Sequence, residues 1–300
     1  MAESGPSRGA RRDPVSQISS GILAGGRLVA VPGLAVVPPS SQGGPSWCLL
    51  DPGDYRARSQ ARPQLVIDHT TGGKWPQRVL PGSGPGGHAE QIARMWSGGD
   101  GGAGKSFHSG AQILIDLNGE VYCLCDVVTC AAYHAEMAND VSIGVEHCTT
   151  PDGNIYQATL DASTALHAAL ESILDIPYQV HAAPYRGGPL VRCEVGEKTP
   201  DYDGRSQSRL RDMAGIIQHR DQTSERGRGD AGDALVAAHI SAGAEPLDYG
   251  KYEDISAASA RQRYLNERGG ALAVDGICGP MSLAEARRQG FRRWRDVPGR

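Results

Sequence analysis

Short apolar runs alternate with polar, glycine-rich segments along most of the chain. The run Leu65–Asp68 is apolar with β-branched residues at its centre, so it predicts a buried strand that ends at His69. Residues 111–125 hold two apolar runs separated by an Asn-Gly pair, a combination typical of a β-hairpin. The segment Ser142–His147 predicts a further buried strand.

Apolar residues at helical spacing predict helices in two parts of the same region. Residues 89–96 predict a short amphipathic helix. A longer helix is predicted after Asp161, and the Asp161 side chain is expected to cap its first turn. The residues that follow place four apolar side chains on one face of this helix. Because strands and helices succeed one another from Arg62 onward, the expected fold class is α/β.

The pattern divides the chain into four parts. Residues 1–60 hold a β-like run and a Pro/Ser/Gly stretch, so we interpret them as an N-terminal extension that could dock on a larger assembly. The main domain is expected at 61–245. A separate helical pattern follows at 255–290, and residues 291–300 form a basic tail.

Composition narrows the classes of partner. The formal net charge of -4 gives no basic field for a nucleic acid. Seven cysteines are an odd number without a C-x-x-C pair, so free thiols in a reducing cytosol are expected rather than disulfides. The apolar stretch Ile18–Val37 is interrupted by Arg27 and Pro32, and we predict neither a membrane span nor a signal peptide.

Three potential metal ligands each follow or adjoin a predicted buried element. They are His69, His219 and Asp230. Two imidazoles and a carboxylate suit zinc and leave a fourth coordination place for water, which is the form of a catalytic site. Spacing alone gives weak support, because each histidine taken singly is more often a hydrogen-bonded or surface residue.

Four motifs strengthen this hypothesis through a resemblance. In chain order they read LVIDHTTGG, SFHSGAQILIDLNGEVYCLC, AAYHAEMANDVSIGVEH and IIQHRDQTSERGRGDAG. This order resembles the type-2 N-acetylmuramoyl-L-alanine amidase and peptidoglycan-recognition family over roughly residues 62–240. The resemblance implies a central mixed β-sheet flanked by helices. It also implies a zinc hydrolase that cuts the amide between N-acetylmuramic acid and L-alanine of bacterial peptidoglycan.

The resemblance also assigns the central chemistry. It implies that His69, His219 and Asp230 bind zinc and that Glu146 acts as general base and later protonates the leaving amine. The segment between His219 and Asp230 is one residue longer than the commonest spacing in the family, so Asp233 is a second candidate for the acidic ligand.

Further positions match the family with less definite roles. Arg228 stands where relatives usually have lysine, and we assign it to stabilise the oxyanion. His134 matches a substrate-facing histidine, although it could instead hold its loop. Asn139 is predicted to bind substrate, although it could likewise shape that loop. His108 could line the substrate groove or have a packing role. It follows Phe107, which stands where many relatives have tyrosine. The remaining histidines have no motif and are interpreted as structural: His88, His147, His167, His181 and His239.

The helical pattern near the C-terminus has its own resemblance. Residues 260–290 are similar to a helical peptidoglycan-binding module, with Leu265 expected to pack against Leu272 and Val274 and a helix beginning near Pro280. The alternative is a helical hairpin that packs on the amidase and binds nothing.

Together these features predict a phage or lysis-associated endolysin whose partner is bacterial peptidoglycan. We expect synthesis in the cytoplasm and action on the cell wall after release or delivery. Two alternatives stay open: a peptidoglycan-recognition module without turnover, and a wall-degrading component docked on a phage tail or injection machine through residues 1–60.

Overall fold

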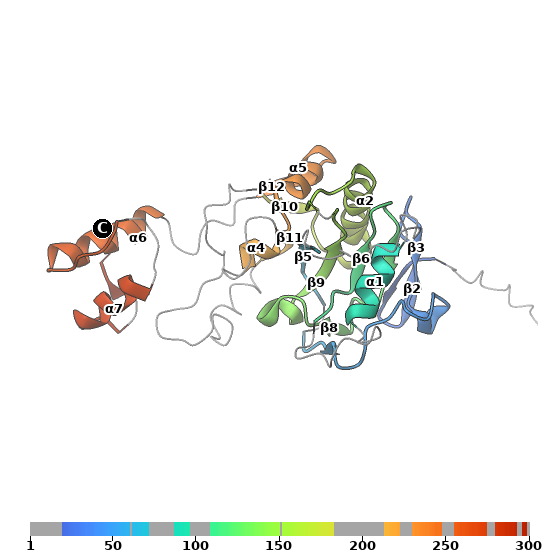
Figure 1. Ribbon diagram of the computed structural model, residues 1–300, viewed down its shortest axis with the longest axis horizontal. Helices are drawn as coiled ribbons and strands as arrows, with labels where there is room; N and C mark the ends of the chain where they lie inside the picture. Colours follow the sequence, from blue (N-terminus) through green and yellow to red (C-terminus); the bar gives the residue numbers. More distant parts are fainter. Residues whose placement is uncertain are drawn as a thin grey trace, which may run out of the picture.

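A mixed β-sheet forms the centre of the protein (Figure 1). Its eight strands lie in the order β12-β10-β11-β5-β9-β6-β7-β3, and all neighbours are parallel except β6 and β7. The predicted class, α/β with a central mixed sheet flanked by helices, is confirmed. The computed structural model describes residues 20–60, 62–71, 87–96, 109–150, 152–182, 213–222, 230–247, 255–274, 280–292 and 296–298.

The strands are short, and only two of those described reach six residues. The sheet strands are β3 (Val36–Val37), β5 (Leu65–Thr70), β6 (Ile113–Ile115), β7 (Val121–Cys123), β9 (Ser142–His147), β10 (Gln179–His181), β11 (Gly215–Gln218) and β12 (Glu245–Leu247). Two separate antiparallel pairs are β1 (Ile22–Ala24) with β2 (Arg27–Val29), and β4 (Tyr55–Ala57) with β8 (Cys130–Ala132).

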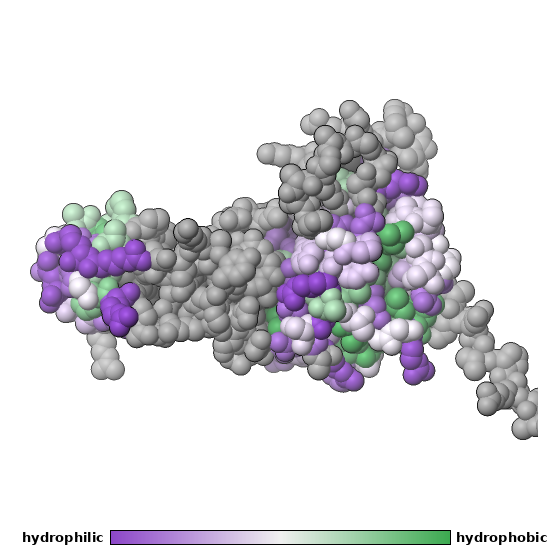
Figure 2. Space-filling view, turned by 90° about the horizontal axis from the view of Figure 1, so that it is seen from below, coloured by the Kyte–Doolittle hydropathy of each residue, from purple (hydrophilic) through white to green (hydrophobic). Residues whose placement is uncertain are grey.

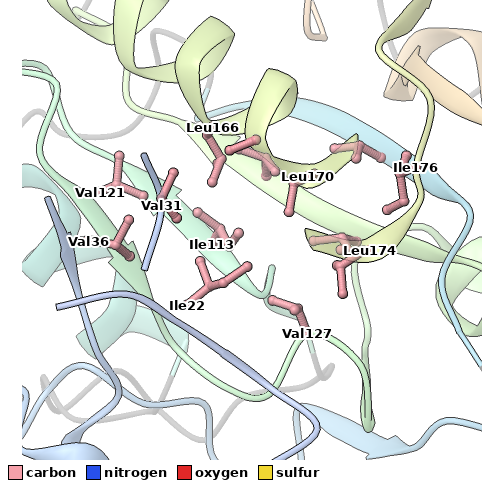
Figure 3. Packing of buried hydrophobic residues seen from close by; sticks show 14 of the residues in the cluster. Ile22, Val31, Val36, Ile113, Val121, Val127, Leu166, Leu170, Leu174 and Ile176 are labelled. Carbon is pink, nitrogen blue, oxygen red and sulfur yellow. The ribbon is translucent and has the colours of Figure 1, made fainter. Parts of the chain in front are cut away.

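Helices cover both faces of the sheet. The longest, α2, sends Leu166, Leu170 and Leu174 onto the same apolar cluster as Ile113 and Val121 (Figure 3). Helix α1 packs with Leu114 and Tyr122 on the opposite face. The helices are α1 (Gly87–Trp96), α2 (Gln157–Leu174), α4 (His219–Gln222), α5 (Asp233–Ser241), α6 (Ile255–Glu267) and α7 (Pro280–Arg288), with 3-10 turns at Ser40–Gln42 and Glu136–Asp140.

Local signals for turns and caps gave mixed results. The predicted hairpin is confirmed as β6 and β7, and Gly119 supplies the positive φ of 82° that its turn requires. The predicted cap at Asp161 is wrong, because α2 already begins at Gln157 and Asp161 accepts a hydrogen bond from that side chain at 2.7 Å. The helix begins earlier because Thr159 is buried and donates to the carbonyl oxygen of Asp116.

The described part of the N-terminal extension belongs to the main body, which corrects the predicted boundary at residue 61. Strand β3 extends the sheet beside β7, and β4 pairs with β8. Ile22 and Val36 lie in the apolar cluster under α2, and Cys48 lies in the cluster under α1. The docking role predicted for residues 1–60 stays a prediction, and residues 1–19 lie outside the described residues.

Free thiols were expected throughout the chain. The described cysteines are free: Cys48, Cys123, Cys125, Cys130 and Cys148. Burial raises the pKa of Cys48 and of Cys123 to about 12, so both stay protonated and act as small apolar core residues.

The C-terminal helices form a small apolar cluster of their own. Leu265 is buried with Ala286 and Val297, and Leu272 packs against them, whereas Val274 is 43% exposed and does not fill the predicted core position. Helix α7 begins at Pro280 as expected. Figure 2 shows hydrophilic residues over much of the described surface of this module. Among the described residues, no helix has the length and apolar character needed to span a membrane.

Arg58 ties β4 to the rest of the body. Its guanidinium donates to five backbone carbonyl oxygens at 2.8–3.2 Å, those of Val127, Val128, Cys130, Asn139 and Ser142. Burial lowers the pKa of Arg58 to about 10, so the group remains charged at neutral pH. These bonds fix the loops on both sides of β8 and the start of β9.

We predict that Arg58→Met lowers the free energy of unfolding by about 3 kcal/mol or more, because several buried carbonyls lose a charged donor. The matched control is Arg56→Met, two residues earlier in β4, which loses an exposed ion pair with Asp140 and should cost less than about 1 kcal/mol. Urea unfolding followed by circular dichroism measures both. Equal small effects would contradict the role given to Arg58.

Candidate metal centre and active site

The ends of two neighbouring parallel strands bring His69 and His219 together. Strands β11 and β5 are neighbours in the sheet (Figure 1). They pair so that Gln218 lies opposite Asp68, and His219 follows directly. Both strands run in the same direction, so their carboxyl ends meet at one edge of the sheet, where ligands commonly bind in α/β proteins. The two imidazole rings have centroids 4.2 Å apart.

Asp230 completes a compact group with these histidines. Its Oδ2 lies 3.0 Å from Nδ1 of His219, and its Oδ1 accepts a hydrogen bond from the backbone N–H of Thr70 at 3.1 Å. One ligand atom from each of His69, His219 and Asp230 lies within 4.8 Å of the other two. The carboxyl is partly exposed, with 19% of its side chain accessible, so the group is open to solvent.

The charge states of the group suit a cation. Burial, together with the neighbouring His219, holds the pKa of His69 well below its usual range, so this ring is neutral. Burial opposes ionisation of Asp230, but its hydrogen bond with His219 and its proximity to His69 bring the pKa of this carboxyl below its usual range. Neutral imidazole and ionised carboxylate are the forms in which these side chains bind metals.

His134 contacts His69. Its Nδ1 lies 2.9 Å from Nε2 of His69, and its Nε2 lies 3.1 Å from Oγ of Ser142. Since the Ser142 hydroxyl donates its hydrogen to the carbonyl oxygen of Ala138, it must accept one from Nε2 of His134. Nδ1 of His134 is then an acceptor for Nε2–H of His69, which leaves Nδ1 of His69 with a free lone pair.

Asn139 holds the loop that carries His134. Its Oδ1 accepts hydrogen bonds from the backbone N–H groups of His134 at 3.1 Å and Ala135 at 2.7 Å. Asn139 is buried, with 4% of its surface exposed. The structure thus gives it a loop-shaping position, and its predicted contact with substrate stays a prediction.

Glu146 shares a sheet face with the metal-ligand group. In the parallel pairing of β5 with β9 it lies opposite His69, and directly paired residues project from the same face. Its side chain is partly buried. This register places a carboxylate-bearing residue beside the first histidine.

The remaining predicted site residues either lie outside this group or are not described by the structure. Asp233, the second candidate for the acidic ligand, forms an ion pair with Arg220 at 2.6 Å and starts α5, so Asp230 is the acid that joins the histidines. Arg228 and His108 lie outside the described residues, as does Phe107.

The donor set fits zinc. Two imidazole nitrogens and one carboxylate oxygen are ligands that zinc takes in catalytic sites, with a fourth place left for water. Among the described residues, His69, His219 and Asp230 converge from separate parts of the chain, and the Asp230 carboxylate is partly exposed. The group therefore has the ligands of a catalytic zinc site and is open to solvent.

Comparison with known proteins identifies the family. A family model described as N-acetylmuramoyl-L-alanine amidase matches residues 59–228, more than half of the chain. The chain belongs to this amidase family.

The chain is also similar to two solved structures. A solved structure titled "crystal structure of Se-Met AmpD derivative" is 19% identical, with a TM-score of 0.41, and the match covers 67% of this chain and 96% of that one. "Structure of the PGRP-Hd from Alvinella pompejana" is 20% identical, with a TM-score of 0.37, and covers 48% and 81%. No curated protein matches the sequence.

The chain has a second group of potential ligands that sequence reasoning missed. It consists of Asp68, His167 and His239, and all three are buried. The available signal was Asp68 itself, because an ionisable residue inside an apolar strand needs a buried partner. The two histidines have no local motif and lie on α2 and α5, far from Asp68 in the sequence.

Gly144 leaves the space that the His134 ring occupies. A Cβ atom at this position would lie 2.6 Å from Cγ and 2.7 Å from Nδ1 of His134. We predict that Gly144→Ala displaces the ring from His69 and weakens zinc binding by about 10- to 100-fold, the usual effect of losing a residue that orients a ligand. Competition with a chromophoric chelator measures the affinity.

The control is the same substitution in a His134→Ala background, where no ring is present to be displaced. There Gly144→Ala should cause almost no further loss of affinity. A loss of equal size in both backgrounds would show that the effect arises from strand β9 and not from His134.

Proposed function

We propose that this amidase hydrolyses the amide between N-acetylmuramic acid and L-alanine of peptidoglycan, with zinc held by His69, His219 and Asp230. The observation that carries the proposal is the convergence of these three side chains within 4.8 Å in a chain that belongs to the amidase family. The presence of two imidazoles and a carboxylate in this group favours turnover over recognition alone.

The residues divide the chemistry between them. When bound, zinc lowers the pKa of a water molecule and polarises the scissile carbonyl. Glu146 takes the proton from the attacking water and returns it to the leaving amine of L-alanine. Arg228, with its fixed charge, stabilises the negative oxygen that develops on the carbonyl. His134 fixes the orientation and tautomer of His69.

Delivery to the wall belongs to the same proposal. We propose a lysis-associated endolysin that meets peptidoglycan after release from the cytoplasm, with α6 and α7 as a wall-binding module. The resemblance of residues 260–290 to peptidoglycan-binding modules supports this role, and the basic residues of the adjoining tail suit anionic wall polymers.

We predict that Glu146→Gln keeps zinc and loses about 10²- to 10⁴-fold in turnover, the usual contribution of a general base. His69→Ala should lose the zinc ion of this centre, and turnover with it. The measurements are zinc content by mass spectrometry and new L-alanine amino groups released from purified sacculi, with and without chelator.

The matched control is Glu171→Gln, an exposed glutamate on α2 outside the site. It should behave as the unchanged protein does. If the unchanged protein binds sacculi and holds zinc yet releases no amino groups, the hydrolase proposal fails and a recognition role without turnover replaces it.

We predict that a chain ending after Leu247 keeps turnover on soluble muropeptides but binds sacculi about tenfold or more weakly, because it loses a second contact with the same polymer. Co-sedimentation with sacculi measures binding. Unchanged binding, with the truncated chain still folded, would show that α6 and α7 do not bind the wall.

A further inference from the structure

A group of ionisable side chains lies buried behind the proposed catalytic centre. Asp68 precedes His69 on β5, so its side chain projects from the opposite face of the sheet, toward α2. There its carboxylate meets His167 of α2 at 2.9 Å and His239 of α5 at 3.3 Å. All three side chains are 0% exposed. A carboxylate removed from water to this extent needs a compensating positive charge.

The hydrogen bonds of His167 show where that charge lies. Its Nδ1 is 2.6 Å from the backbone carbonyl oxygen of Ser163, which can only accept, so Nδ1 carries a hydrogen. In a neutral ring, Nε2 is then an acceptor, and it faces the acceptor Oδ1 of Asp68 at 2.9 Å. Two lone pairs cannot face each other at this distance without a cation between or beside them. A ring N–H bound to a backbone carbonyl is also the usual arrangement behind a metal-ligating histidine.

Two side chains against this carboxylate each carry a buried polar atom that forms no hydrogen bond of good geometry. Nε2 of His239 lies 3.3 Å from Oδ2 of Asp68, which is ion-pair distance, and it has no well-aligned hydrogen bond among the described residues. The same holds for Oε1 of Gln218, whose amide nitrogen donates to Asp68 at 3.2 Å. Unsatisfied buried atoms are uncommon and point to a missing partner.

We propose that Asp68, His167 and His239 bind a second divalent metal ion, zinc by its ligand preference, which fixes α2 and α5 to strand β5. One ligand atom from each residue lies within 4.8 Å of the other two, as is also true of the group at His69. Ligand atoms around a tetrahedral zinc are about 3.4 Å apart, so the ion fits with small side-chain shifts. The buried amide oxygen of Gln218 is the neighbouring group with a free acceptor.

His147 borders this site without being a ligand. Its Nδ1 donates to the backbone carbonyl oxygen of His69 at 2.8 Å, and its Nε2 is engaged with Oγ of Ser163 at 2.8 Å. Both ring nitrogens are therefore used, which explains why His147 stands 4.0 Å from Asp68 while the two ligand histidines lie closer. The buried site is linked in this way to the backbone of the first catalytic ligand.

The rival explanation is a proton in place of the ion. If His167 were a buried imidazolium, it would donate to Asp68 and neutralise the carboxylate without metal. That arrangement accounts for the contact at 2.9 Å, with His239 as a second side chain 3.3 Å from the same carboxylate, but it leaves Oε1 of Gln218 without a partner among the described residues. Metal content distinguishes the two explanations.

The test counts zinc in a chain whose catalytic centre has been disabled. Full-length His219→Ala, purified and dialysed against a weak chelator, should fall from about two zinc ions per chain to about one. Adding His167→Gln to this variant should remove the remaining ion. The control is His181→Gln, a buried histidine of β10 outside both groups, which should leave about one ion in place.

Each outcome decides the proposal. If His219→Ala keeps its circular dichroism spectrum and holds no zinc, the buried ion does not exist and the imidazolium pair is correct. If His167→Gln fails to fold, X-ray absorption of cobalt-loaded His219→Ala must show nitrogen and oxygen ligands with two imidazoles, and their absence would overturn the site. If the unchanged chain holds one ion that survives His219→Ala, the buried site stands and the proposed catalytic zinc fails.

Discussion

The parallel pairing of β5 with β9 and β11 is the constraint on which the rest of the structure depends. It brings the carboxyl ends of β5 and β11 together, so that His69 and His219 meet, and it sets Glu146 opposite His69. Alternation along β5 also sends Asp68 to the opposite face. A slip of one residue in this register would exchange the two faces and place His69 in the core under α2.

The two acid and imidazole groups differ mainly in access to water. The side chain of Asp230 is 19% exposed, whereas that of Asp68 is 0% exposed. An open group can admit a water molecule and a substrate carbonyl, while a closed group can only hold the chain together. The same donor types can therefore carry out chemistry on one face of the sheet and stabilise the fold on the other.

Part of the fold and of the site was predictable because the signals are local. An apolar run that ends in a histidine locates His69 and His219, and the Asn-Gly pair locates the hairpin of β6 and β7. The choice of Asp230 rested on the family motif, since Asp233, three residues later, was a second candidate for the acidic ligand.

Other features were not predictable, because they depend on contacts between distant segments. Strand β3 has two residues and exists because β7 offers it an edge, so the body begins before residue 61. Asp161 has the sequence of a cap, yet burial of Thr159 starts α2 one turn earlier. His167 lies 99 residues from Asp68, and no local pattern connects them.

Two segments supply members to both groups and a third borders both, and this shared origin explains how the site is held. Strand β5 gives Asp68 and His69, and the end of β11 gives Gln218 and His219, in each case to opposite sides. The segment 230–241 gives Asp230 to the open group and, through α5, His239 to the closed one. Because consecutive residues of one backbone serve both groups, any interaction that fixes Asp68 against α2 and α5 also limits the movement of His69. The rigidity that a metal centre needs is then provided by the buried face of the same strand.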